Sequence, residues 1–212
     1  MQRIGLFDGI GEDKISKMLH CFKPEYRSFK KGESIMLYAQ KPEYICVLLQ
    51  GRAHLSCVDK DGEQTILEYY GENDIFGEAF DLPYGEYGYI AEADTNCEVM
   101  FILFSTICGR CKNTCEHHTV LVENLFRMTA QKAQMLALRI SVISKKTVKN
   151  KLSAYMYLQS ERAGKNTFTT DLTWSKLADY LCVDRTSLMR ELRALKTEGK
   201  IRTKGRSVTI LQ

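Results

Sequence analysis

The clearest signal in the sequence is the stretch Leu177-Ala178-Asp179-Tyr180-Leu181-Cys182-Val183-Asp184-Arg185-Thr186-Ser187-Leu188-Met189-Arg190-Glu191-Leu192. Thr173 and Asp184 carry side chains that favour helix N-caps, so we expect helices over 174–181 and 185–197 with a tight turn at 182–183. Two β-rich runs within 201–210 flank Lys204-Gly205 and predict a small hairpin. Helix, turn, helix and hairpin in this order predict a winged helix-turn-helix.

The second of these helices is expected to have one buried and one exposed face. At about 100° per residue, Leu188, Leu192 and Leu195 fall within about 60° of one another. Thr186, Arg190 and Arg193 lie on the opposite side. Thr186 and Arg190 are suited to contact bases or phosphates. Arg185 occupies the first turn of the helix, and in a recognition helix the residues of this turn point at base edges in the major groove. The basic residues expected at the DNA backbone are Lys196, Lys200, Arg202, Lys204 and Arg206. The alternative is a solvated basic face on a helical bundle.

Charge divides unevenly along the 212 residues. The segment 144–212 contains 15 Lys/Arg and 6 Asp/Glu, a net charge of +9, which leaves −5 for the rest of a chain whose total is +4. A basic segment attached to an acidic body is typical of a polyanion-binding module joined to another domain.

The N-terminal half has the pattern of a β-sandwich or barrel. Short β-rich runs recur at 34–38, 44–49, 53–58, 64–70 and 97–102, with glycines between several of them. Asp61-Gly62 is a strong hairpin signal between two of these runs. Strands this short at this spacing are typical of all-β sandwiches.

After the β-rich runs, the spacing of apolar residues changes to the spacing typical of a helix. It predicts one long helix from about His117 to Ile143, a segment that contains no Gly or Pro. One apolar stripe of this helix is a heptad seam. A second apolar stripe at Leu121, Leu125, Met128 and Met135 broadens the apolar face of the helix. Two stripes favour one face on the barrel and one on a second copy of the chain, and the alternative is a core helix within one chain. The heptad seam consists of Val122, Phe126, Thr129, Ala133, Leu136, Ile140 and Ile143.

The quoted stretch resembles the DNA-binding motif of the Crp/Fnr superfamily of transcription regulators. Tyr70-Gly71-Glu72-Asn73-Asp74-Ile75-Phe76-Gly77-Glu78 is similar to that family's G-x-x-F-G-E turn, and Cys97-Glu98-Val99 to its following strand. The resemblance implies an α+β protein: an effector-sensing jelly roll (a double-stranded β-helix) over 1–116, a dimerisation helix over 117–143 and a winged helix-turn-helix over 144–212. It further implies a homodimer on palindromic double-stranded DNA, with RNA polymerase as a partner of an activator.

Carried over by position, Arg185, Thr186 and Arg190 become the base readers, and Thr173 a phosphate contact at a helix N-terminus. The phosphate contacts that we expect are Thr173, Ser187, Arg193, Lys204 and Arg206. One departure is Cys182, where the family usually has glycine. A left-handed backbone there costs another residue roughly 1–2 kcal/mol, so either Cys182 is mildly strained or the turn differs from that of the family.

The effector is unknown from the sequence, and cyclic AMP is not expected. The Arg-Ser or Arg-Thr pair that holds the ligand phosphate in cyclic-nucleotide members falls here on Tyr87-Gly88, and 82–90 contains no Arg or Lys. A phosphodiester buried without a cation is costly. The residues expected around an effector pocket are Phe76, Gly77, Glu78, Tyr87 and Lys132.

Three of the eight cysteines cluster at Cys108, Cys111 and Cys115, next to His117. The preferred interpretation is that these thiols are reduced and bind no ligand. One alternative is a zinc or iron–sulfur site, which would make the chain a metal sensor. The other alternative is a redox-active pair of thiols. The other five are expected to be buried thiols. No signal peptide or membrane span is evident, so we expect a cytoplasmic regulator without enzymatic activity. A cupin-like jelly-roll enzyme, or a ligand-binding module that docks protein, are the remaining alternatives.

Overall fold

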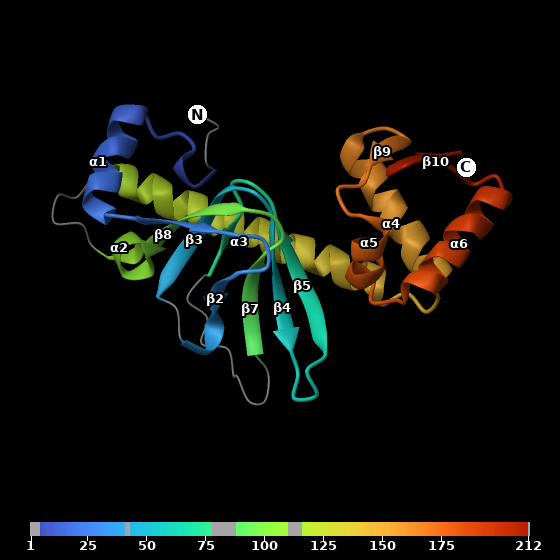
Figure 1. Ribbon diagram of the computed structural model, residues 1–212. Helices are drawn as coiled ribbons and strands as arrows, with labels where there is room; N and C mark the ends of the chain where they lie inside the picture. The colour runs from blue at the N-terminus through green and yellow to red at the C-terminus, as the bar shows by residue number, and fades with distance from the viewer. Residues whose placement is uncertain (1–4, 41–42, 78–87, 110–115, 212) are drawn as a thin grey trace. The chain divides into compact units, whose positions relative to one another are not determined.

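A computed structural model of the chain describes residues 5–40, 43–77, 88–109 and 116–211. It divides into two compact units, an N-terminal unit (Met1–Lys132) and a C-terminal unit (Ala133–Gln212). The division falls within one long helix, α3 (Glu116–Ile143). The N-terminal unit combines two sheets with helices, and the C-terminal unit is mainly helical (Figure 1).

Two antiparallel sheets form the body of the N-terminal unit (Figure 1). One has the order β1-β8-β3-β6 and the other β2-β7-β4-β5. Alternating apolar side chains from both sheets are buried between them, including Leu48 and Phe76 of the first sheet and Tyr70 of the second. The predicted jelly-roll sandwich is confirmed. Its strands are β1 (Glu25–Phe29), β2 (Ser34–Leu37), β3 (Tyr44–Gln50), β4 (Ala53–Val58), β5 (Gln64–Tyr70), β6 (Ile75–Phe76), β7 (Gly88–Ala93) and β8 (Cys97–Leu103).

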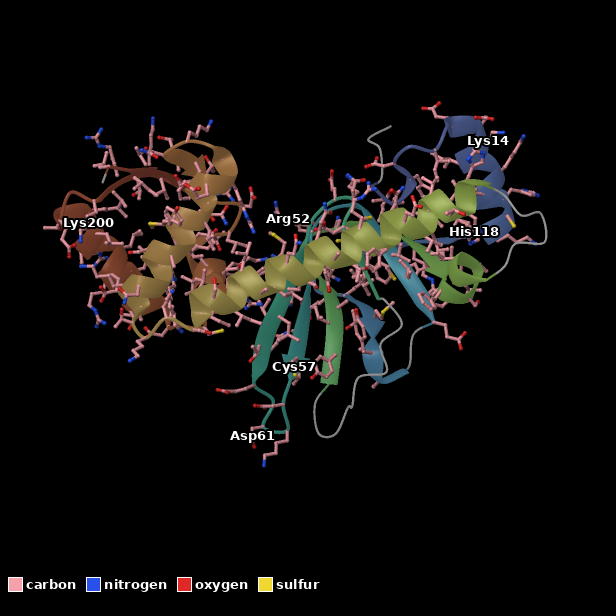
Figure 2. All side chains as sticks on the ribbon, turned by 180° about the vertical axis from the view of Figure 1, so that it is seen from behind. Lys14, Arg52, Cys57, Asp61, His118 and Lys200 are labelled. Atoms are coloured by element: carbon pink, nitrogen blue, oxygen red, sulfur yellow. The ribbon has the colours of Figure 1, made fainter. Side chains whose placement is uncertain are left out.

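The predicted hairpin at Asp61-Gly62 is also confirmed. Strands β4 and β5 pair antiparallel from Ala53↔Tyr70 to Val58↔Gln64, and Figure 2 shows Asp61 at the tip. Gly62 has φ +82°, a conformation that glycine adopts without steric cost. One run ends earlier than expected, because Tyr38 begins a short 3₁₀ helix, η2 (Tyr38–Gln40), rather than extending β2.

Helices close one side of this sandwich. A 3₁₀ helix, η1 (Gly5–Phe7), α1 (Glu12–Phe22), α2 (Phe104–Cys108) and the first part of α3 share a core with β3 and β8. Leu121 and Leu125 are buried in that core, and Met128 packs against it. The second apolar stripe of α3 therefore contacts the sandwich as predicted, as far as Met128.

The seam of α3 stays largely uncovered within a single chain. Phe126 is 76% exposed, Ile140 60%, Leu136 40% and Val122 39%. Thr129 and Ala133 are also exposed, and Ile143 is half-buried. The helix thus has one face against its own sandwich and an apolar face open to solvent.

The C-terminal unit contains the end of α3, three further helices and a three-stranded sheet of order β10-β11-β9. Its core is a cluster around Leu152, Leu177, Leu188 and Leu192. Strands β10 and β11 form the predicted hairpin, called the wing below. The elements are α4 (Val148–Ala163), β9 (Thr167–Thr169), α5 (Trp174–Tyr180), α6 (Arg185–Thr197), β10 (Ile201–Lys204) and β11 (Ser207–Ile210).

The expectation that the five scattered cysteines are buried is wrong for three of them. Cys46 and Cys97 are buried, whereas Cys21 and Cys182 are exposed and Cys57 is half-buried. Cys21 lies in the last turn of α1 but not among its buried residues, and Cys182 lies in the turn after α5, so neither side chain reaches a core. Within the described part of the chain, no helix combines the length and apolar character needed to cross a membrane.

Candidate nucleic-acid interface

Both helices of the helix-turn-helix begin at capped N-termini. The Thr173 side chain accepts a hydrogen bond from the Lys176 amide at 3.3 Å, and Asp184 Oδ1 accepts one from the Ser187 amide at 2.8 Å. Hydrogen bonding from Ser187 holds the pKa of the Asp184 carboxyl below its ordinary value. The caps fix the start of α5 and of α6 where the sequence predicted them.

The turn between these helices is a Schellman motif. The Val183 amide donates to Ala178 O at 3.0 Å and the Cys182 amide to Asp179 O at 3.1 Å. Cys182 has φ +51°, so of the two possibilities for this departure from glycine the structure shows the left-handed backbone rather than a different turn. The turn consequently places a residue other than glycine at a position that favours glycine.

The two faces of α6 separate as expected. Leu188, Leu192 and Leu195 are at most 2% exposed and pack in the core of the unit. Four side chains of the opposite face reach solvent, and Ser187 is half-buried. Arg190 Nε lies 3.4 Å from Glu191 Oε1, yet the Arg190 side chain remains 71% exposed. The exposed residues are Arg185, Thr186, Arg190 and Arg193.

The wing adds further cations next to the start of α5. Lys204 and Arg206 are exposed on either side of Gly205, which has φ +61°. Arg206 Nη1 donates to Asp171 O at 2.9 Å, and the Thr170 amide donates to Arg206 O at 3.1 Å. These bonds tie the wing to the loop that leads into Thr173, whose side chain is exposed. The structure thus gathers the predicted phosphate contacts Thr173, Lys204 and Arg206 on one unit.

Two basic residues that the sequence did not single out contact the turn. Arg139 of α3 and Lys151 of α4 donate to its backbone carbonyls. Neither lies in the quoted motif, and no spacing rule connects them to it. Only the packing of α3 and α4 on α5 reveals them.

The residues expected around an effector pocket have different surroundings in the N-terminal unit. Phe76 is fully buried and stacks on Tyr70 with ring centroids 4.8 Å apart. Gly77 has φ +74°, and a Cβ there would meet Met36 Cε at 2.8 Å. Glu78 and Tyr87 lie outside the described residues.

Lys132 joins α3 to the end of β5. Its Nζ lies 3.2 Å from Glu68 Oε2, donates to Ile75 O at 3.3 Å, and lies 5.2 Å from the centroid of the Tyr70 ring. Burial raises the pKa of the nearby Asp74 carboxyl. The lysine is therefore engaged by groups of its own chain.

The cysteine cluster falls mostly outside the described residues. This holds for Cys111 and Cys115, and of Cys108 only its place at the end of α2 is described. His117 is half-buried in the first turn of α3, and a ring nitrogen of the neighbouring His118 contacts Ile107 O. Among the described side chains, no three His, Cys, Asp or Glu residues are grouped as a metal site. Metal binding by the cluster stays a prediction.

Each of the two units contains a segment that matches a known protein family. A cyclic nucleotide-binding domain family matches residues 26–106, and a Crp-like helix-turn-helix domain family matches residues 150–212. A probable transcriptional regulator, flp of Lacticaseibacillus casei, is 23% identical over 87% of this chain and 82% of its own length. A CRP-like cAMP-activated global transcriptional regulator of Mycobacterium tuberculosis is 22% identical over 99% of this chain and 93% of its own.

Solved structures show the same fold. A CooA mutant from Carboxydothermus hydrogenoformans superimposes with a TM-score of 0.76 at 11% identity, covering 100% of this chain and 93% of that one. At such identity the likeness concerns the fold alone.

Proposed function

Because the chain belongs to the Crp/Fnr family of transcription regulators, we propose that it binds palindromic DNA as a homodimer under the control of an effector other than cyclic AMP. In this proposal residues 1–116 sense the effector, 117–143 dimerise and 144–212 bind DNA. The family matches favour a regulator over the cupin-like enzyme and the protein-docking module. A chromosomal regulator works in the cytoplasm, and an activator of this kind contacts RNA polymerase.

The exposed N-terminal half of α6 carries the DNA-binding part of the proposal. Its leucines are buried, so the helix cannot turn another face outward, and Arg185, Thr186 and Arg190 remain accessible at the end that enters the major groove. The wing and the N-terminus of α5 supply Thr173, Lys204 and Arg206 for phosphates. We assign base readout to the first group and affinity without sequence preference to the second, together with Ser187 and Arg193.

The test is selection of a preferred duplex from a random pool, followed by binding measurements on that duplex and on a scrambled one. For the wild-type chain we expect a clear preference and a steep fall of affinity with salt. Arg185→Ala should remove the preference, since a bidentate arginine–guanine contact discriminates by about 1–3 kcal/mol. Lys204→Ala, as the matched control, should weaken both duplexes alike. A preference that survives in Arg185→Ala refutes the assignment of base readout.

The open seam supports the homodimer. Seven positions at heptad spacing lie on one side of α3, and the two most exposed apolar ones are Phe126 and Ile140. An apolar stripe of this length is typical of a helix that packs against a partner helix. Two chains joined there would present two copies of α6, as palindromic half-sites about one helical turn apart require.

Two observations support an effector other than cyclic AMP. The segment 82–90 offers no cation for a phosphate, and Lys132 is engaged by Glu68 and Ile75 O. Millimolar cyclic AMP should therefore leave the thermal unfolding midpoint unchanged. A rise of several degrees at that concentration would overturn the proposal.

The cysteine cluster favours a second candidate, a redox- or metal-sensing regulator. Thiolates spaced as in Cys108, Cys111 and Cys115, with His117 adjacent, are ligands that zinc and iron–sulfur clusters use. The test is an absorption spectrum and metal analysis of anaerobically purified protein. Bound metal that is lost when the three cysteines are replaced together supports this candidate, and colourless metal-free protein excludes a metal centre.

A further inference from the structure

The C-terminal end of α5 leaves three consecutive carbonyls to be satisfied by side chains. The Schellman bonds use Ala178 O and Asp179 O. The last carbonyls of a helix have no donor within it, and cations next to them are favourable. The carbonyls that follow belong to Tyr180, Leu181 and Cys182.

Two cations from outside the helix-turn-helix contact all three. Arg139 Nε donates to Tyr180 O at 3.2 Å, and Lys151 Nζ donates to Leu181 O at 3.2 Å and to Cys182 O at 3.5 Å. The Arg139 guanidinium also lies over the Tyr180 ring, 4.6 Å from its centroid. Arg139 is 9% exposed and Lys151 is half-buried. The bonds to Tyr180 O and Leu181 O are partly shielded from water, whereas the bond to Cys182 O is exposed.

We propose that Arg139 and Lys151 are positioning residues for DNA readout: they hold the turn 180–182 and thereby set where α6 begins. Only Val183 separates Cys182 from the cap residue Asp184, and Arg185 follows directly. The turn also contains a left-handed residue other than glycine, a conformation that its surroundings must enforce. The proposal rests on the proposed DNA-binding function.

The experiment compares Arg139→Gln and Lys151→Met with conservative and control variants. Arg139→Lys and Lys151→Arg keep the charge. Arg127→Gln, on an exposed part of α3, and Lys149→Met, on α4 but paired with Glu198, change the charge equally without touching the turn. Two quantities are measured for each variant: the ratio of dissociation constants for the scrambled and selected duplexes, and amide hydrogen exchange at residues 182 and 183.

In Arg139→Gln and Lys151→Met we expect the ratio to fall about tenfold, the worth of one hydrogen bond to a charged group. In these two variants the amides of residues 182 and 183 should exchange faster. Lys151→Arg should keep both the ratio and the exchange rates near their wild-type values. The controls should change the ratio less than about twofold. Wild-type values in both variants would overturn the proposal. So would an equal loss of affinity for both duplexes together with a lowered unfolding midpoint, because that is a purely structural effect.

The sequence preference of the wild-type chain separates this proposal from the one on which it rests. A wild-type chain without sequence preference refutes the proposed function and, with it, any role of these residues in readout. If the wild-type chain has a sequence preference and the Arg139→Gln and Lys151→Met variants keep that preference, only the positioning role is refuted.

Discussion

Replacing Phe126 by Asp should convert a dimer into folded monomers. Phe126 is 76% exposed in one chain, and an aromatic side chain covers roughly 200 Å², so about 150 Å² of it remains open. At ~25 cal/mol per Å² this area corresponds to about 4 kcal/mol per chain if fully buried. With half of it buried, two copies contribute about 4 kcal/mol, or roughly a thousandfold in the dimer dissociation constant.

The assay is sedimentation velocity over a range of protein concentrations, with far-ultraviolet circular dichroism to show that the fold persists. The wild type should sediment as a dimer and Phe126→Asp as a monomer, because the side chain does not contribute to the core of its own chain. Tyr157→Asp is the matched control, since Tyr157 is 60% exposed but lies on α4 rather than on the seam of α3, and it should leave the dimer intact. A Phe126→Asp chain that remains dimeric at the same concentrations refutes the assignment of the interface.

Three further changes test the C-terminal unit. Leu192→Ala, at a side chain only 1% exposed, should lower the free energy of unfolding by about 2–5 kcal/mol; an unchanged calorimetric midpoint would contradict its place in the core. Cys182→Gly should raise stability by up to ~1 kcal/mol by relieving the left-handed backbone, and denaturant unfolding that shows a loss instead would argue against strain. Burial raises the pKa of Tyr155 to about 12 from an ordinary 10.0, so its phenol should titrate late, and this late titration should be missing in Tyr155→Phe. Because the unfolded chain loses that proton first, stability is fully present below pH 10 and falls between pH 10 and about 12, which unfolding curves at several pH values would check.

Local chemistry made much of the C-terminal unit predictable. Thr173 and Asp184 favour caps, so the starts of α5 and α6 follow from side-chain hydrogen bonds within three residues. The left-handed backbone at Cys182 was suggested only by the glycine that the resembled family has there, because a cysteine does not itself favour that conformation. The two stripes of α3 were predictable for a related reason, since helical periodicity determines which residues share a face.

Elements that depend on distant partners were not predictable. Four of the six residues of strand β7 are weak strand formers, namely Gly88, Ala91, Glu92 and Ala93. The strand nevertheless pairs with both β2 and β4, because position within a sheet outweighs intrinsic preference. Arg139 and Lys151 contact carbonyls 41 and 30 residues away, respectively. No pattern in the sequence encodes such contacts.

The sheet order of the C-terminal unit also has a consequence for damaged copies of the protein. Strand β11 lies between β9 and β10, and it follows both in the chain. A chain cut before Ser207 would leave both neighbours unpaired and remove Val208 from the core, while the whole of α3 is kept. If the chain dimerises through α3 as proposed, such a fragment would still pair with an intact chain. The resulting dimer would have a single intact winged helix-turn-helix. Truncated copies are therefore expected to act as dominant inhibitors of the intact regulator rather than as inert products.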